Sequence, residues 1–75
     1  MITKYQLLEQ EKYIEHCGIV KTYGIVGIED EVCVIEDISD EYDQVLNLVN
    51  QLNNLQVELV HFPFVVNDFI TTKYL

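Results

Sequence analysis

The residues best suited to chemistry in this chain are two cysteines and two histidines. They are Cys17, Cys33, His16 and His61. Zinc prefers thiolate and imidazole ligands, but structural zinc sites usually supply them in closely spaced pairs, which these four do not form. His16 and Cys17 are adjacent, and neighbours on a strand point to opposite faces, which disfavours a Cys–His nucleophilic pair. We therefore expect no metal ion, no cofactor and no catalytic set.

These four residues suit structural roles instead. We expect both thiols to be buried and reduced, and a disulfide would require that neighbouring strands carry them. His61 precedes a Phe-Pro pair, so we expect it to cap or hydrogen-bond near the start of the last helix.

Acidic residues form the second group. Between Thr22 and Thr72 the chain has ten Asp and Glu residues and no Lys or Arg. Calcium binds clustered oxygen atoms, but the Asp-x-Asp-x-Asp-Gly loop is absent, so only weak, nonspecific cation binding is expected. Catalytic carboxylates need a pKa raised by burial, whereas polar runs surround these acids. We therefore expect a protein that is not an enzyme.

Composition restricts the class of protein further. The 75 residues suit one domain, residues 1–75, and 49% apolar residues supply one compact core. A net charge of -9 disfavours direct binding to nucleic acid or to an anionic membrane. The first residues have no apolar signal-peptide region and no run approaches the ~20 residues of a membrane span, so we expect a cytoplasmic protein.

The first half of the chain has the composition of strands. Residues 2–9 predict a strand, residues 10–12 a turn, and residues 13–28 one bent strand or two short ones. The interior glycines of the last segment indicate a bulge, a bend or a close backbone approach. Residues 29–31, Glu-Asp-Glu, lie between two apolar runs and predict a hairpin. Three adjacent carboxylates there have no evident role in folding.

The second half predicts two helices. Ser39 is a favourable N-cap, and three acids follow it in what would be the first turn, where the helix dipole favours negative charge. An apolar stripe at helical spacing then continues until Asn53 and Asn54 end the helix. The final helix is expected over residues 63–73, after an irregular or extended approach at residues 57–62, because Pro63 fits best in a first turn. Phe64 falls off its apolar face.

Strands in the first half of the chain and helices in the second define the fold class. It is α+β, with a small antiparallel sheet of three to four strands followed by two helices packed on one face.

Three short motifs carry a resemblance to a known family. They are Tyr-Gly-Ile at residues 23–25, Ile-Glu-Asp-Ile-Ser at residues 35–39, and the closing stretch of His61, Phe62 and residues 65–70. Together with the intervening amphipathic helix, they resemble a family of small Firmicute proteins of unknown function. Pro63, Phe64 and Asn67 depart from the polar or acidic residues usual there. The resemblance implies a bacterial cytoplasmic protein with a shared fold, and it implies no activity.

We favour a small non-catalytic protein-interaction or regulatory module. The first helix has an apolar stripe covering about half its circumference, and Phe64 lies off the apolar face of the last helix, which is more apolar surface than so small a fold easily covers. Self-association, most simply as a two-fold homodimer, would cover this surface. The candidate interaction surface consists of Leu48, Leu52, Leu55, Phe64, Glu29, Asp30 and Glu31.

The alternative is an acidic mimic of nucleic acid that inhibits a DNA- or RNA-binding protein. Eight carboxylates between Glu29 and Asp43, without a neutralising base, motivate this hypothesis. Mimicry would require these acids to lie along one extended face.

Overall fold

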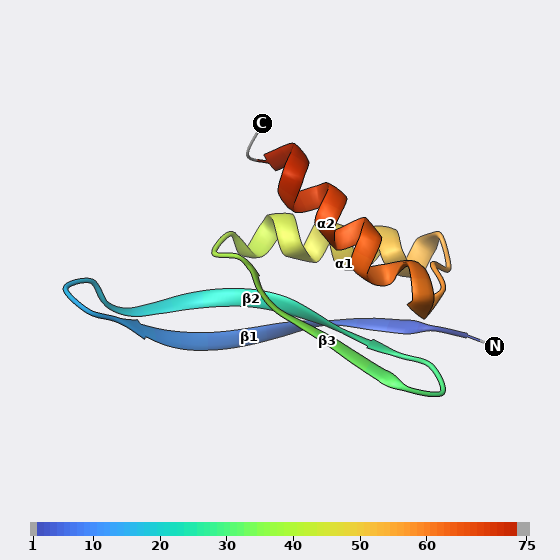
Figure 1. Cartoon of the computed structure of the whole chain (residues 1–75), viewed down its shortest axis with the longest axis horizontal. Coiled ribbons are helices and arrows are strands. Elements are labelled where there is room, and N and C mark those ends of the chain that lie inside the picture. Colours follow the sequence, from blue (N-terminus) through green and yellow to red (C-terminus); the bar gives the residue numbers. More distant parts are fainter. Residues whose placement is uncertain (1, 74–75) are drawn as a thin grey trace.

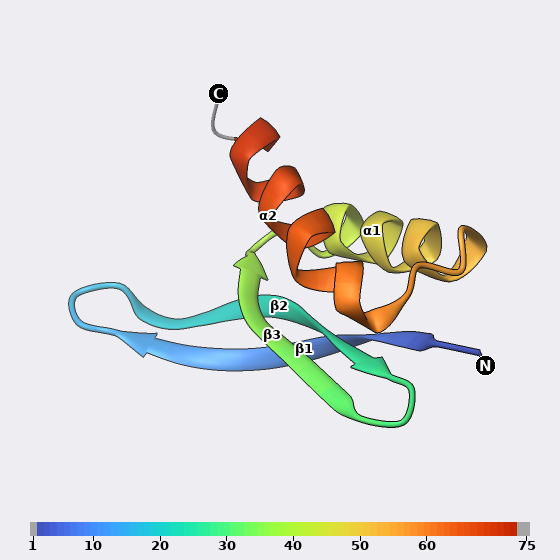
Figure 2. The same ribbon diagram turned by 45° about the vertical axis from the view of Figure 1, so that its right-hand side comes forward.

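Three antiparallel strands come first along the chain and two helices follow, as the computed structural model shows for residues 2–73 (Figure 1). The strands form one sheet in the order β1-β2-β3, which confirms the predicted fold class. Both helices lie over one face of this sheet, here called the front face, in both views (Figures 1 and 2). The elements are β1 Lys4–Ile14, β2 Gly18–Ile28, β3 Val32–Ser39, α1 Tyr42–Asn54, η1 Leu59–His61 and α2 Phe62–Lys73.

The β1–β2 hairpin is longer than the sequence predicted. Its register runs from Lys4 opposite Ile28 to Ile14 opposite Gly18, and residues 15–17 form the turn. The predicted turn at residues 10–12 is wrong, because these residues continue β1. The part of this hairpin formed by residues 10–22, here called the arm, extends past β3 and the helices (Figure 1). β3 pairs with β2 only between residues 23 and 28, so the arm has just two strands.

A bulge turns β3 toward the helices. Ile25 pairs with Ile35 and Tyr23 with Ser39, so Gly24 alone lies opposite three residues of β3. A Cβ atom on Gly24 would collide with the carbonyl oxygen of Ile35. This confirms the close backbone approach expected from the interior glycines.

The core lies between the front face and the helices. Side chains alternate along a strand, so the odd-numbered residues of β1 and β2 point to the helices and the even-numbered ones point away. The rings of Tyr5 and Phe62 meet edge to face with centroids 5.0 Å apart. Gly27 lies opposite Tyr5, and a Cβ there would overlap Leu59 and the Tyr5 ring. The buried hydrophobic residues are Tyr5, Tyr23, Ile25, Ile38, Val45, Leu48, Val49, Leu52, Phe62 and Val66.

The helix α1 begins two residues later than its predicted N-terminal signal indicates. Ser39 is the last residue of β3 rather than the N-cap, and its Oγ accepts a hydrogen bond from the Glu41 N–H at 3.1 Å. Glu41 occupies the N-cap position, and Asp43 is the acid of the first turn. The helix ends at Asn54, as predicted.

Asn53 joins the end of α1 to the free edge of β1. Its Oδ1 accepts from the Tyr5 N–H at 2.9 Å, and its Nδ2 donates to the Tyr5 carbonyl at 3.0 Å. The Tyr5 hydroxyl donates to the Val57 carbonyl at 2.6 Å. This side-chain amide therefore substitutes for a neighbouring strand at an edge that would otherwise be open.

The helix α2 confirms the prediction for the last segment. It begins at Phe62 with Pro63 in its first turn, after the short 3-10 helix η1. In residues 2–73 neither helix is long and apolar enough to cross a membrane.

Candidate interaction surfaces

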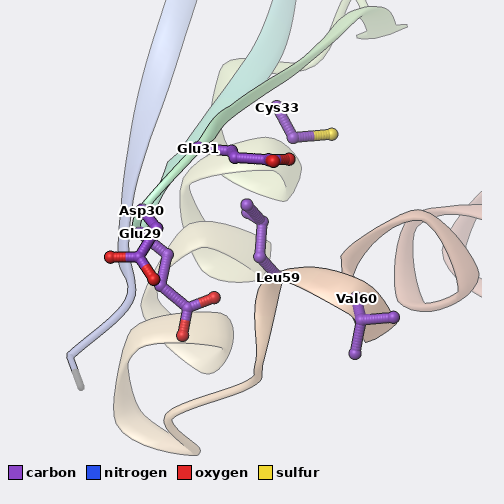
Figure 3. Close-up of a pocket in the computed structure, with 6 residues that line it drawn as sticks. All are labelled: Glu29, Asp30, Glu31, Cys33, Leu59 and Val60. Carbon is purple, nitrogen blue, oxygen red and sulfur yellow. The ribbon is translucent and has the colours of Figure 1, made fainter.

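The hairpin that joins β2 to β3 forms one wall of a hollow. Residues 29–31 make the predicted hairpin, which is closed by the Glu29 N–H donating to the Glu31 carbonyl at 3.0 Å. The hollow has a volume of about 460 Å³ and is open to solvent. It is lined by Glu29, Asp30, Glu31, Cys33, Leu59 and Val60 (Figure 3).

The side chains of this acidic hollow come from the hairpin, β3 and η1. Glu31 and Cys33 project to the same side of β3, and Leu59 extends from η1 toward them (Figure 3). The hollow combines carboxylates with the apolar side chains of Leu59 and Val60, which suits a cationic group on an aliphatic stem.

The hydroxyl of Tyr5 responds to the same charges. Burial raises the pKa of this hydroxyl, and the charges of Glu29 and Cys33 raise that pKa further.

The residues considered for zinc do not come together. His16 and Cys17 lie in the turn at the tip of the arm, while Cys33 lies in β3 beside the hollow at the other end of the hairpin. Both thiols are free, and Cys17 is exposed, so the expectation that it is buried is wrong. No group of three or more His, Cys, Asp or Glu side chains in the described part of the chain is arranged to hold a metal ion.

His61 lies in η1 directly before α2. Its backbone N–H donates to the Glu58 carbonyl at 2.9 Å. It therefore occupies the predicted position near the start of the last helix.

The predicted apolar interaction surface divides into two parts. Leu48 and Leu52 are 5% and 1% exposed, so they belong to the core and cannot supply an external surface. Leu48 belongs to the buried core cluster, and Phe69 of α2 packs against that cluster, so the wide apolar stripe on α1 serves the core. Leu55 and Phe64 are exposed, as an interaction surface requires, and the exposure of Phe64 agrees with its predicted off-face position.

A second exposed apolar surface lies on the sheet face opposite the helices. Its residues alternate with the core residues and point away from α1 and α2. Val26 lies opposite Val34, and Ile28 lies opposite Val32, so the side chains form adjoining cross-strand pairs. Val32 is 65% exposed and Val34 is 47% exposed. We call this surface the back patch, and it consists of Leu8, Val26, Ile28, Val32 and Val34.

The sequence contains a signal for the back patch in two apolar runs. Residues 25–28 and 32–35 are continuous apolar runs rather than alternating ones. An antiparallel strand with one solvated face typically alternates apolar and polar residues, whereas a continuous run is typical of burial on both faces. The two runs therefore indicate a sheet with a second covering layer, which residues 2–73 do not provide.

Comparison with known proteins assigns the family. The chain belongs to a family of unknown function, DUF6514, whose model matches residues 1–72. No curated protein and no solved structure matches the chain.

Proposed function

We propose that this protein is a non-catalytic interaction module that self-associates by packing the back patch of one copy against that of another. The observation that carries this proposal is a sheet with apolar side chains on both faces and helices on only one. A second copy would supply the missing layer. Two sheets that pack face to face lie about 10 Å apart and bury the side chains between them. A two-fold arrangement would use the same patch on both subunits.

The charges around the back patch support this choice. The patch contains no carboxylate, although the chain carries a net charge of -9. The charged residues that border it are Lys4, Glu36 and the carboxylates of the hairpin at residues 29–31, which lies beyond Ile28 and Val32. Val60 is another exposed apolar residue, and it lines the acidic hollow. Contact through Val60 would bring two such hollows together, each with three carboxylates that repel those of the other copy. The back patch is therefore an apolar surface without a carboxylate of its own, whereas Val60 lies among the carboxylates of the hollow.

Pairing through the free edge of β3 is a less favourable form of self-association. It would add backbone hydrogen bonds, but it would leave the back patch in water. Mimicry of nucleic acid is also less favoured, because Glu29–Glu31 and the acids at residues 40–43 lie beyond opposite ends of β3.

The size of the patch sets the expected affinity. It spans about 14 Å along the strands and about 10 Å across them, from the usual spacing of residues and strands. This is small beside the roughly 800 Å² per partner of a standard interface, so the proposed dimer is a weak one that should form only at high protein concentration.

Sedimentation across a range of concentrations tests the proposal. The wild-type chain should pass from monomer to dimer, and Val32→Asp should weaken the dimer at least about tenfold, because it would bury an unpaired carboxylate. Ile19→Asp is the matched control. Ile19 is 69% exposed, similar to Val32, but it lies on the arm and points to the front face.

The outcomes separate the surfaces. An unchanged dimer for Ile19→Asp together with a weakened dimer for Val32→Asp supports the back patch. A strict monomer at millimolar concentration would contradict self-association, and an equal loss in both variants would contradict the choice of surface.

A further inference from the structure

The two outer edges of the sheet differ in what covers them. At the β1 edge, the Asn53 side chain bonds the N–H and carbonyl groups of Tyr5. At the β3 edge, no strand of residues 2–73 lies alongside β3, and no backbone hydrogen bond from a loop or turn in this range reaches Val32 or Val34. An open edge of this kind is a template for a further strand, because its backbone groups can still pair.

The hydrogen bonds of Tyr5 determine which backbone groups of the sheet point outward. Successive residues of a strand direct their N–H and carbonyl groups to opposite sides. Since those of Tyr5 point away from β2, those of Lys4 point toward β2, where Lys4 lies opposite Ile28. The backbone groups of Ile28 therefore point to β1, and those of the next residue, Gly27, point to β3.

The same alternation leaves the backbone groups of two valines at the open edge. Gly27 pairs with Cys33, so the N–H and carbonyl groups of Cys33 point to β2. Val32 and Val34 lie on either side of Cys33 and direct their backbone groups to the open edge. Each of these valines offers an N–H donor and a carbonyl acceptor to an added strand.

The acidic hollow lies beside this edge, on the front side of β3. Cys33 lies between the two valines, and its side chain lines the hollow together with Glu31 (Figure 3). An added strand alternates its side chains as β3 does. A residue placed next to Cys33 therefore directs its side chain to the side of the hollow, and its two neighbours direct theirs to the back face beside Val32 and Val34.

The lining of the hollow defines the side chain that fits it. The carboxylates of residues 29–31 attract a cation, and Leu59 and Val60 can contact an aliphatic stem. Lys and Arg combine these two properties. On the back face, apolar neighbours suit the added strand best, because they would form cross-strand apolar pairs with Val32 and Val34.

Charge favours a segment of another protein over a second copy of this chain as the occupant. β3 has no Lys or Arg, and the β3 strand of a second copy would bring Glu36 and Asp37 to an edge that already adjoins three carboxylates. A basic partner would instead be attracted by the net charge of -9.

We propose that the open edge of β3 binds an extended segment of a basic partner protein as an additional antiparallel strand. A Lys or Arg of this segment enters the acidic hollow, and the apolar residues before and after it pair with Val34 and Val32. Main-chain hydrogen bonds supply affinity in this mode of recognition, and the side-chain pocket supplies specificity. The edge is a different surface from the back patch, so this site does not depend on self-association.

A synthetic peptide tests the role of the hollow. The probe is a capped peptide of sequence Gly-Ser-Thr-Val-Arg-Val-Thr-Ser-Gly, titrated against the labelled protein by NMR at a protein concentration well below dimer formation. It should slow hydrogen exchange of the Val32 and Val34 amides. The matched peptide with Glu in place of Arg should bind at least about tenfold more weakly, because it places a fourth carboxylate beside the hollow.

N-methylation of the peptide tests strand pairing separately. In the antiparallel register, the N–H groups of the two peptide valines point to β3 and that of the arginine points away. Methylating both valine nitrogens should abolish binding, whereas methylating the arginine nitrogen should change the affinity by less than about threefold. The two methylated peptides keep the same side chains and charge.

A protein variant tests the contribution of the hairpin. Glu31→Gln should weaken binding of the arginine peptide about fivefold, because it removes one carboxylate of the hollow. Asp68→Asn is the control for net charge, since Asp68 is exposed on α2 and does not line the hollow. Equal effects of the two variants would contradict a local role for the hollow.

The remaining outcomes separate this proposal from the back patch. Equal affinity for the arginine and glutamate peptides would overturn the basic partner, and equal effects of the two methylations would overturn strand addition. A chain that binds the arginine peptide as described but stays monomeric would contradict self-association alone.

Discussion

The two faces of the sheet have similar side chains and different environments. On the front face, Ile25 is fully buried beneath the helices, and Cys33 and Ile35 pack against the same core. On the back face, Val32 and Val34 belong to the same apolar run and remain largely in water. The amino-acid composition of a strand therefore does not determine which of its faces the chain itself covers.

This difference separates folding from association. Front-face side chains contribute to the stability of the monomer, because the helices remove them from water. Back-face side chains contribute little until another surface covers them. The same strands can thus serve the core on one side and a partner on the other.

The largest contrast between the faces is expected for Phe62→Ala against Val32→Ala. Phe62 is fully buried against Tyr5, so its truncation should lower the free energy of unfolding by about 3–5 kcal/mol. Val32→Ala should change it by less than about 0.5 kcal/mol in the monomer. Urea unfolding at a concentration well below dimer formation measures both. Equal losses would contradict the division between the faces.

A smaller effect is expected where α1 holds the edge of β1. Asn53→Ala removes both hydrogen bonds to the Tyr5 backbone and should cost about 2 kcal/mol. It should also speed hydrogen exchange of the Tyr5 amide. Asn54→Ala is the control, because the neighbouring Asn54 is exposed. If the two variants were equally stable, the edge contact would have no role in stability.

The Tyr5 hydroxyl gives a prediction about pH. Tyr5→Phe loses the bond to the Val57 carbonyl and should cost about 1 kcal/mol at neutral pH. Burial raises the pKa of Tyr5 above its ordinary value of 10.0 in the folded chain, with Glu29 and Cys33 adding to the rise. The folded state therefore retains the proton longer than the unfolded state, and this stabilising contribution is present below pH 10 and is lost as the pH rises beyond it.

Urea unfolding of wild type and Tyr5→Phe at about pH 8 and about pH 11 measures this loss. The difference between the two proteins should shrink at the higher pH. A difference that is constant or grows would contradict the environment described for the phenol.

The smallest effect is expected for an exposed ion pair between the arm and the bulged part of β3. Lys12 and Asp37 pair at 3.1 Å, but their side chains are 58% and 51% exposed. Lys12→Ala should therefore change stability by less than about 0.5 kcal/mol, and added salt should remove the difference. A loss above about 1 kcal/mol in thermal unfolding would show that the arm is coupled to the core more tightly than its two-stranded pairing indicates.

The sequence predicted those elements that have strong local signals. The hairpin at residues 29–31 lies between two apolar runs, and Pro63 marks the first turn of α2. The turn of the arm was misplaced because residues 10–12 are polar. An exposed two-stranded ribbon carries polar residues as readily as a turn does. The actual turn places His16 and Gly18 at φ values of 73° and 83°. Gly18 was the available signal, because glycine adopts such angles readily.

The interaction surface was harder to predict because it depends on tertiary structure. Helical periodicity places Leu48 on an apolar stripe, but it does not reveal that the fold buries Leu48 in the core. The role of Asn53 depends on a contact with Tyr5, which is distant in the sequence. The back patch could have been found, since an apolar run on both faces of a strand implies two covering layers.

The most direct test of self-association through the back patch is an isotope-filtered NMR experiment on a mixture of labelled and unlabelled chains. It detects methyl contacts between subunits at a concentration where the dimer is populated. The proposed packing predicts intermolecular contacts among the methyl groups of Ile28, Val32 and Val34. Intermolecular contacts at Leu55, Phe64 or the arm, with none from these three residues, would contradict it.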